Sequence, residues 1–281
     1  MTRPQPIPHK RKTVPDARRA NRLDGRRWPQ YSLSVWSDIR KSADEQRLKH
    51  PALFPAALVD RLMQAYLRPE GRVVLDPFMG TGSTLIAARD AGKDAIGFEL
   101  APAFIELAKR RLEQNSFDGR AGSFEIFRGD ARQLVAALEP DSVDLCVTSP
   151  PYWNILNQKR TADSKEKRHY GNLEGDLGTL ASYEEFVRQL GEIFQGVLRA
   201  LRPGAYCCVN VMDLRKKDRF YPLHSDIARE LTGRGFLFDD LIVWNRGQEY
   251  NNLRPLGYPY TFRINKIHEF IVVLRKPPVA Q

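Results

Sequence analysis

The segment Arg72-Val-Val-Leu-Asp-Pro-Phe-Met-Gly-Thr-Gly-Ser-Thr84 decides the fold class of this chain. Residues 72–76 form a short apolar run that predicts a buried strand, and 83–91, without glycine or proline, predicts a helix. Gly80 and Gly82 let the turn approach a ligand closely, beside free N–H groups at the helix start. No lysine follows the second glycine, so this is not a phosphate loop, and the dinucleotide fingerprint lacks its third glycine. A tight turn without a ligand is the alternative.

Strands and helices alternate along the rest of the chain. The pattern predicts strands over 94–99, 123–127, 143–148, 205–212, 236–244 and 268–274, and helices over 58–67, 103–112, 183–201 and 225–232. This alternation is typical of an α/β fold with a doubly wound, mainly parallel sheet. Ligands in such sheets bind beyond the carboxyl ends of the strands, so the functional residues are expected there.

The net charge of +10 is concentrated near the N-terminus. Residues 1–30 contain nine basic and two acidic residues, whereas 35 basic and 32 acidic residues leave the remaining chain nearly balanced. We therefore expect a flexible basic arm over 1–30 that suits a polyanion such as nucleic acid. A leader that only keeps the protein soluble is the alternative.

Composition excludes several classes of protein. No run approaches 18 consecutive apolar residues, which excludes a transmembrane helix, and the basic N-terminus lacks the apolar core of a secretory signal. Three cysteines, two of them adjacent, are too few for a disulfide scaffold. We therefore expect a cytoplasmic protein with a substantial core, without a membrane partner and without a metal site.

Acidic residues end the two strands that follow the glycine turn. Glu99 lies 23 residues after Asp76, where a carboxylate can accept hydrogen bonds from a ribose diol. Asp130 follows the third strand and could accept from the amine of an adenine. The alternatives are a solvated surface charge for Glu99 and a helix cap for Asp130. Together, the three strand ends predict a nucleoside-shaped pocket.

The fourth strand ends in Thr148-Ser-Pro-Pro-Tyr-Trp153, the most specific of these features. Two prolines fix φ and remove two backbone donors, so the carbonyls beside them are held rigid. Rigid acceptors next to an aromatic ring suit a planar heterocycle with an exocyclic amine, because the serine hydroxyl and a carbonyl can accept the amine hydrogens. A proline turn that only closes the strand is the alternative.

Together these motifs resemble those of the amino-group DNA methyltransferases, which use S-adenosylmethionine to make N4-methylcytosine or N6-methyladenine. The glycine turn is similar to the family's cofactor loop, and 149–152 to its catalytic motif of Asp, Asn or Ser, two prolines and an aromatic. The segments 50–55 and 268–276 are similar to its methionine-packing segment and late strand. The resemblance covers roughly residues 48–275. It implies a Rossmann-like methyltransferase fold with an antiparallel late strand, as a single domain with loop insertions.

The resemblance also implies roles for individual residues. The catalytic residues are Ser149, Pro150, Pro151 and Tyr152, with Tyr152 stacking on the base. The cofactor-binding residues are Phe54, Asp76, Pro77, Phe78, Gly80, Gly82, Ser83, Glu99, Leu100, Asp130 and Ala131. The substrate-binding residues are Trp153, Lys159, Arg160, Arg246, Arg254, Tyr258 and Arg263. For Trp153, extension of the stacking platform and support beneath it are both open.

Two departures from the family pattern bear on the organisation of the chain. The cofactor motifs precede the catalytic motif, whereas many relatives with this style of glycine loop have the reverse order. No separate target-recognition domain is visible, so DNA is expected to contact the arm and the inserted loops 154–181, 213–222 and 246–263. The expected domain spans 31–281, with a cofactor half at about 48–140 and a catalytic half at about 141–276.

The expected activity is methylation of the exocyclic amine of a base flipped out of double-stranded DNA. Serine at the first motif position and tryptophan after the aromatic resemble the cytosine-N4 group, so cytosine is the expected base and adenine N6 the alternative. An RNA base methyltransferase, a small-molecule N-methyltransferase and a catalytically inactive nucleic-acid-binding regulator are the rival hypotheses. A cognate restriction endonuclease is a further candidate partner.

Overall fold

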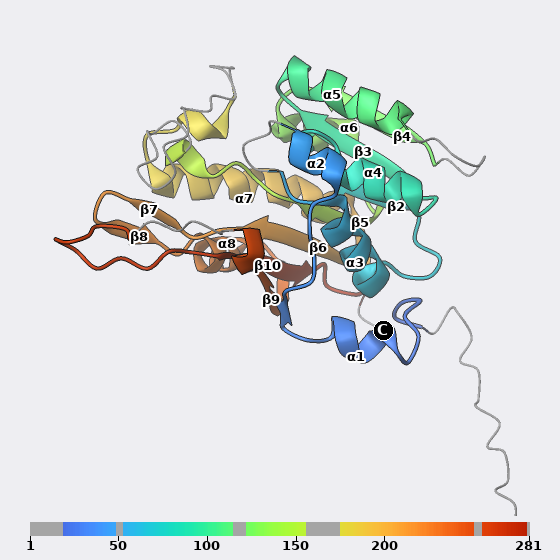
Figure 1. The fold of residues 1–281 in the computed structure, drawn as a ribbon. Coiled ribbons are helices and arrows are strands. Elements are labelled where there is room, and N and C mark those ends of the chain that lie inside the picture. Colours follow the sequence, from blue (N-terminus) through green and yellow to red (C-terminus); the bar gives the residue numbers. More distant parts are fainter. Residues whose placement is uncertain (1–18, 49–52, 115–121, 156–174, 250–254, 280–281) are drawn as a thin grey trace, which may run out of the picture.

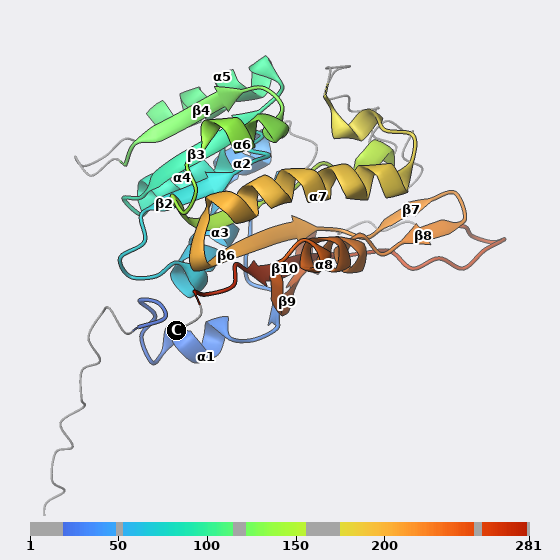
Figure 2. The same cartoon turned by 180° about the vertical axis from the view of Figure 1, so that it is seen from behind.

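The computed structural model describes residues 19–48, 53–114, 122–155, 175–249 and 255–279. An eight-stranded sheet lies between two layers of helices (Figures 1 and 2). The strand order across it is β1 (Val35–Trp36), β9 (Leu237–Asn245), β10 (His268–Arg275), β6 (Leu201–Val211), β5 (Val143–Thr148), β2 (Val73–Asp76), β3 (Asp94–Glu99) and β4 (Phe124–Arg128). The expected α/β fold with a doubly wound sheet is confirmed.

The sheet is mainly parallel, and β10 is the strand that breaks the pattern. Neighbours from β4 through β3, β2 and β5 to β6 pair in parallel, as does β1 with β9. β10 is antiparallel to both β6 and β9, which confirms the expected antiparallel late strand. Because β2, β3 and β5 run in the same direction, their carboxyl ends meet at one edge of the sheet.

Helices cover both faces of the sheet and enclose two cores. One face is covered by α3 (Ala56–Tyr66), α4 (Ser83–Asp90) and α5 (Pro102–Glu113), and the other by α6 (Leu134–Ala137), α7 (Tyr183–Ala200) and α8 (Leu223–Gly233) (Figure 2). Side chains alternate across a strand, so Cys207 joins the core under α7 and Cys208 the core under α3. The adjacent cysteines therefore fill two different cores.

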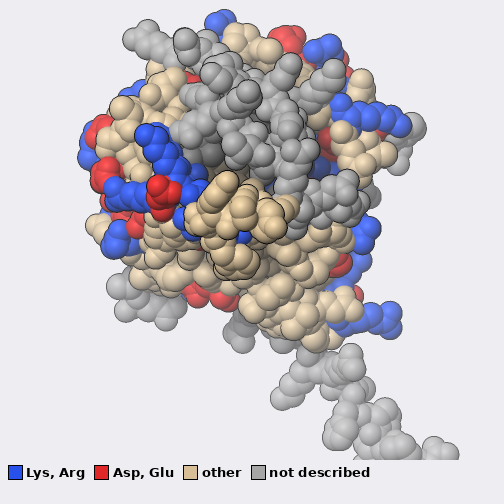
Figure 3. All heavy atoms as spheres, turned by 60° about the vertical axis from the view of Figure 1, so that its left-hand side comes forward, with Lys and Arg blue, Asp and Glu red and all other residues tan. Residues whose placement is uncertain are grey.

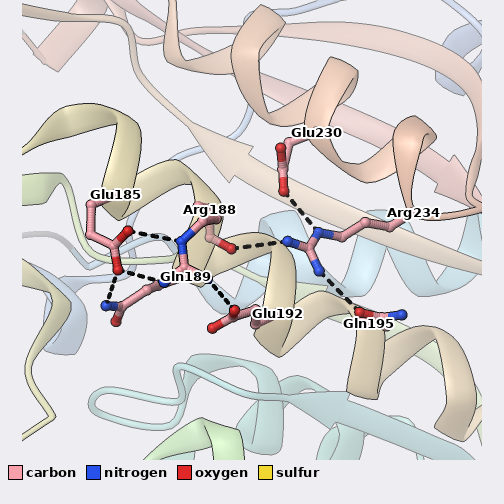
Figure 4. A network of polar contacts seen from close by, with 7 residues as sticks. All are labelled: Glu185, Arg188, Gln189, Glu192, Gln195, Glu230 and Arg234. Atoms are coloured by element: carbon pink, nitrogen blue, oxygen red, sulfur yellow. Dashed lines mark hydrogen bonds and ion pairs between the residues drawn. The ribbon is translucent and has the colours of Figure 1, made fainter.

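The long helix α7 is amphipathic, with a buried apolar face and a charged outer face. Ser182 caps its start by accepting from the Glu185 backbone N–H at 3.2 Å. On the outer face, Arg188 pairs with Glu185 and Glu192 (Figure 4). Arg234, which follows α8, donates to the Gln195 side chain at 3.0 Å and the Arg188 carbonyl at 3.3 Å. These contacts tie α8 to α7 above the sheet.

Two expectations about the later elements are wrong. The predicted strand over 205–212 begins earlier, at Leu201, because Arg202, Pro203 and Gly204 also belong to β6. The predicted loop 213–222 contains a hairpin of β7 (Leu214–Lys216) and β8 (Arg219–Tyr221). Its charged residues 215–219 lie between Leu214 and Tyr221, which are both buried, so one side of the hairpin packs on the core.

The expectation of a flexible arm over 1–30 is wrong for residues 19–30, and 1–18 lie outside the described residues. Leu23 is buried, and the side chain of Asn21, also buried, donates to the Ala65 carbonyl at 2.9 Å. A short helix, α1 (Arg27–Tyr31), follows. Arg22 also donates to the Pro69 carbonyl at 2.7 Å and Arg27 to the Gln64 side chain at 3.1 Å, so this basic segment is anchored beside α3. Within the described residues, no helix has the length and apolar character needed to cross a membrane.

Candidate active site

A pocket lies at the carboxyl ends of β2, β3 and β5. Together with its open mouth it encloses about 790 Å³ of space. Its lining comes from five places: the segment before α3, the glycine turn, the end of β3, the proline motif and Asp176. The lining residues are Leu53, Phe54, Phe78, Met79, Gly80, Thr81, Ser83, Phe98, Glu99, Leu100, Ala101, Ser149, Pro150, Pro151 and Asp176.

The glycine turn has a backbone that other residues would strain. Gly80 and Gly82 have φ of 53° and 82°, in the left-handed region. A Cβ on Gly82 would lie 2.9 Å from the Cβ of Ala108 on α5. Gly82 itself is not among the lining residues, so its role is to let α4 and α5 pack closely, while Gly80 forms part of the wall.

Asp76 braces the site from behind instead of facing it, which corrects the expectation that it contacts the cofactor. Its carboxylate is fully buried and accepts from the hydroxyls of Thr84 and Thr148, each at 2.6 Å. It also accepts from the Phe78 backbone N–H at 3.0 Å. Burial raises its pKa to about 6, against the hydrogen bonds from Thr148, Thr84 and Phe78, which lower it. Asp76 thus joins β2, α4 and β5 beneath the pocket, and Pro77 beside it is likewise outside the lining.

Glu99 lies at the pocket wall, as expected. Its Oε2 accepts from the Gly80 N–H at 2.9 Å and its Oε1 from the Ala101 N–H at 2.8 Å. Burial raises the pKa of Glu99, and these backbone hydrogen bonds oppose the shift. The Leu100 backbone N–H also contributes a hydrogen bond that lowers this pKa. A carboxylate has about four acceptor sites, so one remains for a ribose hydroxyl. The geometry therefore fits a ribose.

The structure gives Asp130 the helix-cap role, which was the alternative. Its Oδ1 accepts from the Arg132 N–H at 2.9 Å, and its Oδ2 from the Arg132 Nε at 2.6 Å. Neither Asp130 nor the buried Ala131 is among the residues that line the pocket. The expected contact of these two residues with an adenine is not supported, because the Asp130 carboxylate turns to its own loop.

The proline motif, residues 149–151, forms a ledge in the pocket wall. Ser149, Pro150 and Pro151 all line the pocket, as expected of the catalytic residues. Thr148 anchors the ledge, since its hydroxyl donates to Asp76. The same carboxylate therefore holds both the glycine turn and the ledge. The distance between the glycine turn and the ledge is therefore set by the buried Asp76 carboxylate and not by contacts between loop residues.

Tyr152 and Trp153 do not lie at the pocket wall. The Tyr152 ring is buried in the core under α7, and its hydroxyl donates to Glu269 Oε2 at 3.1 Å. The expected stacking of Tyr152 on a base is not seen in this arrangement. Trp153 is only 4% exposed and donates to the Leu180 carbonyl at 2.8 Å. Its ring packs edge-on against Tyr183, so Trp153 supports the ledge from below.

Most of the expected DNA-contacting residues have other partners or lie outside the described residues. Lys159, Arg160 and Arg254 are outside them, as is the segment 49–52. Arg246 pairs with Glu269 and Glu249, and Arg263 pairs with Asp218 on the hairpin. Tyr258 is 78% exposed and is free to contact a large partner.

Sequence reasoning missed two acidic residues close to the ledge. Asp176 lines the pocket and caps the short helix η4 (Leu177–Thr179), accepting from the Gly178 N–H at 2.8 Å. Burial raises the pKa of Asp176. Nothing in its surroundings in the sequence marked it. Glu269 had a signal, because it is a lone carboxylate near the start of the apolar strand 268–274.

A third group that the sequence did not reveal holds the N-terminal segment to the glycine turn. Glu45 of α2 (Ala43–Arg47) is buried and accepts from the Ala56 N–H at 2.7 Å. Arg111 of α5 lies 3.6 Å from Glu45 and donates to the Thr81 carbonyl at 2.6 Å. These contacts span both ends of the segment that carries Phe54, and so place its ring in the pocket.

One unsatisfied group shows that the pocket fits a polar ligand. The Ser83 hydroxyl is buried at the pocket lining, and no described residue is its hydrogen-bond partner. Buried hydroxyls usually have one, so a bound ligand with a polar end would complete it. With Glu99 at one side and apolar Phe54 and Phe78 as walls, the residues suit an amino-acid-bearing nucleoside.

Family comparisons match most of the chain. The family described as DNA methylase, of N6 and N4 methyltransferases, matches residues 5–110 and 143–280. A general methyltransferase domain matches 75–164. The chain is 39% identical over 79 residues to the Type II methyltransferase M.ScaI of Streptomyces caespitosus, covering 28% of this chain and 25% of that protein. It is 31% identical over 156 residues to the tRNA (guanine(10)-N2)-dimethyltransferase of Pyrococcus abyssi (strain GE5 / Orsay), covering 51% and 46%.

The chain is also similar to solved structures, of which the first named here shows the fold. The [4+2]-cyclase SpnF has a TM-score of 0.51 at 15% identity, covering 79% of this chain and 82% of its own. The putative DNA modification methylase TTHA0409 of Thermus thermophilus, solved with S-adenosyl-L-methionine, is 29% identical with a TM-score of 0.40, covering 54% and 55%. The chain spans about a quarter to a half of the length of the curated relatives above. Because the DNA methylase family matches well over half of its residues, the chain belongs to that family, whose cofactor is S-adenosylmethionine.

Proposed function

We propose that this protein transfers a methyl group from S-adenosylmethionine to the exocyclic amine of a DNA base, and that the base is cytosine, methylated at N4. One observation supports this most strongly: Gly80 and Glu99 share a pocket with Ser149 and Pro150. Residues suited to the methyl donor and residues suited to the acceptor thus face one space. Holding two reactants in one oriented site is a large part of what such a transfer requires.

The cofactor would be held mainly by Glu99, the glycine turn and the apolar wall. Glu99 would accept from a ribose hydroxyl, and Ser83 would meet the polar methionine end. Phe54, Phe78 and Leu100 would pack on the remaining surface. When bound, the cofactor supplies an electrophilic methyl group attached to a sulfonium.

The ledge would supply the catalysis on the base. An exocyclic amine is a poor nucleophile because its lone pair is delocalised into the ring. The Ser149 hydroxyl and the Pro150 carbonyl would accept its two hydrogens, which localises the lone pair on nitrogen. The same acceptors stabilise the positive charge that develops there during transfer. The prolines keep these acceptors in place before the base arrives, so no reorganisation is needed.

A base inside a duplex cannot reach this pocket, so it would have to leave the stack. The hairpin β7–β8 and the segment 255–264 project together at one end of the molecule (Figures 1 and 2), joined by the ion pair of Arg263 with Asp218. Figure 3 shows an uncharged projecting surface there with Lys and Arg beside it. Tyr260 and Phe262 are 92% and 93% exposed, which suits contact with unstacked bases or a DNA groove.

Cytosine is preferred to adenine because Ser149 and Trp153 resemble the cytosine-N4 group, and adenine N6 is the alternative base. RNA is a second candidate substrate. The relative from Pyrococcus abyssi acts on the exocyclic amine of a tRNA guanine, as its name states, and it aligns over 156 residues. The acceptor geometry of Ser149 and Pro150 would serve an amine in either nucleic acid.

Nucleoside analysis tests these alternatives together. Purified protein is incubated with isotopically labelled S-adenosylmethionine and either duplex DNA or tRNA, and the digested products are separated by mass spectrometry. We expect N4-methylcytosine from DNA and none with Pro150→Ala, whose cofactor affinity should stay within a few-fold. If the product is N6-methyladenine, the target base is adenine and not cytosine. If the label appears in RNA alone, the assignment of DNA as the substrate is wrong. If the protein binds DNA but neither binds the cofactor nor transfers a methyl group, the hypothesis of a catalytically inactive nucleic-acid-binding regulator is favoured.

The basic arm and the restriction partner are proposals of the same kind. Residues 1–18 contain five basic residues and one acid, so we propose that they contact phosphates. Deleting them should reduce the slope of log affinity against log salt by up to about 4 without changing the base methylated. An unchanged slope would make the arm a leader. We also propose that methylation protects sites from a cognate endonuclease, which digestion of methylated plasmid with host extracts would reveal.

A further inference from the structure

The hairpin β7–β8 and the segment 255–264 form one unit, the projection (Figures 1 and 2). Arg263 of the segment donates to the Lys217 carbonyl at 3.2 Å and to the Asp218 carboxylate at 2.5 Å, both in the turn of the hairpin. The isolated bridge of Leu256 with Arg263 closes the segment on itself. The exposed aromatic rings of the segment therefore keep a fixed place relative to the hairpin.

The hairpin is basic, and one of its cations differs from the others. Arg215, Lys217 and Arg219 are exposed, whereas Lys216 is half-buried. Exposed cations on a projecting hairpin suit the phosphates of DNA, and salt should weaken their contribution to binding. A half-buried ammonium gives up part of its hydration and therefore needs partners within the protein. The burial of Lys216 thus indicates a role inside the protein and not at the DNA surface.

The partners of Lys216 are the two residues that follow Tyr152 after the ledge. Its Nζ donates to Asn154 Oδ1 at 3.0 Å and lies 4.1 Å from the centroid of the Trp153 ring. The face of an indole attracts a cation at this distance, and more strongly where water is partly excluded. Both partners are held in turn, because the Trp153 Nε1 and the Asn154 amide donate to the Leu180 carbonyl at 2.8 and 3.2 Å. Lys216 therefore joins the projection to the chain beside the ledge with a defined geometry.

The backbone of Trp153 makes this junction sensitive to its surroundings. Its φ is 43°, in the left-handed region that a bulky side chain rarely adopts and that persists only where neighbouring groups hold it. The groups that hold the ring are Tyr183 of α7 and two residues of the hairpin, Tyr221 and Lys216. Trp153 lies two residues after Pro151, so its conformation sets the direction in which the chain leaves the ledge. The hairpin thus helps to fix the ledge as well as its own position.

We propose, resting on the proposed function, that Lys216 is a positioning residue that holds the projection in register with the ledge, so that DNA bound on the projection presents its extruded base to Ser149 and Pro150. Lys216 acts through Trp153 and Asn154 and does not itself touch the base. Transfer requires closely aligned reacting atoms, whereas binding to phosphates does not. Loss of this contact should therefore slow transfer without a matching loss of DNA affinity.

Lys216→Met tests this, because it keeps the apolar stem of the side chain and removes the ammonium. On DNA that the wild type methylates, we expect the single-turnover rate at saturating DNA to fall about 10- to 100-fold, the range for a misplacement of about 1 Å. Lys217→Met is the matched control, since it removes the same charge from the neighbouring, exposed position. It should keep the wild-type rate at saturating DNA. In a fluorescence titration, both variants should lose DNA affinity to the same extent, and Lys216→Arg should recover most of the rate.

Equal rates for Lys216→Met and Lys217→Met at saturating DNA would overturn the proposal, as would a rate of Lys216→Met that more DNA restores. Asn154→Ala approaches the same contact from the other side, because it keeps the lysine and removes its acceptor. Its rate at saturating DNA should also fall, and it decides the matter if circular dichroism shows that Lys216→Met does not fold; a wild-type rate would then count against the proposal. Absence of transfer by the wild type to any DNA would instead defeat the proposed function, and this inference with it.

Discussion

Replacing Asp76 with asparagine is expected to stabilise the protein at neutral pH, although three hydrogen bonds converge on this carboxylate. Its Oδ1 accepts from Thr148 and from the Phe78 N–H, and its Oδ2 accepts from Thr84. An asparagine can keep all three contacts. Its oxygen can serve Thr148 and Phe78, and its amide can donate to Thr84, whose own hydrogen can turn to the Val147 carbonyl, 3.3 Å away.

The expected gain comes from removing a buried charge. Burial raises the pKa of Asp76 from 3.8 to about 6. Because the folded pKa is above the unfolded value, the stability that this group contributes is fully present below about pH 4 and is lost as the pH rises through about 6. At about 1.4 kcal/mol per pH unit, the charged form lowers the free energy of unfolding by about 3 kcal/mol at neutral pH. Asparagine does not titrate and avoids this loss.

Urea denaturation of both proteins between about pH 4 and pH 7.5 measures the effect, because the other carboxyls titrate alike in the two. The difference in unfolding free energy should grow from near zero to about 3 kcal/mol in favour of Asp76→Asn. As a control of opposite sign, Thr148→Val removes one donor and should destabilise the protein by about 1–3 kcal/mol at neutral pH. A difference that stays constant with pH, or an asparagine variant that is weaker at neutral pH, would refute the reasoning.

Three further variants test the site. Gly82→Ala should lower the free energy of unfolding by about 1–3 kcal/mol, because φ is 82° and the new Cβ would lie 2.9 Å from Ala108. A loss below about 0.5 kcal/mol in urea denaturation would contradict this. Glu99→Ala should weaken cofactor binding by about 1–3 kcal/mol in calorimetry, and an unchanged affinity would remove Glu99 from the ribose site. Replacing exposed Tyr260 and Phe262 with serine should weaken DNA binding in a fluorescence titration while stability stays within about 0.5 kcal/mol; unchanged DNA affinity would exclude the 255–264 segment from the interface.

Where local pattern decides structure, the sequence was a reliable guide. The short apolar runs became β2, β3 and β5 at nearly the predicted bounds, since a buried parallel strand must be apolar on both faces. Parallel pairing then places their carboxyl ends together, so a pocket at Gly80, Glu99 and Ser149 follows from the order of motifs along the chain.

Local pattern failed where a few contacts outweigh composition. The charged segment 213–222 forms a hairpin because Leu214 and Tyr221 are buried, and residues 19–30 are held by Leu23 and Asn21 despite their basic character. In both cases the charged side chains stay at the surface, so ordering the segment requires little loss of their hydration. The number of charges was therefore a poor guide to whether these segments form regular structure.

The sequence by itself determined the fold class, the family and the edge of the sheet where chemistry occurs, because these depend on periodicity and on motifs only a few residues long. Only the tertiary structure decided which way individual side chains face. Asp76 turned inward to two threonines, Asp130 to its own loop, and Tyr152 to a glutamate 117 positions away. A polar group removed from water takes whichever partner the packing brings within reach, and that partner is set by distance in space and not along the chain.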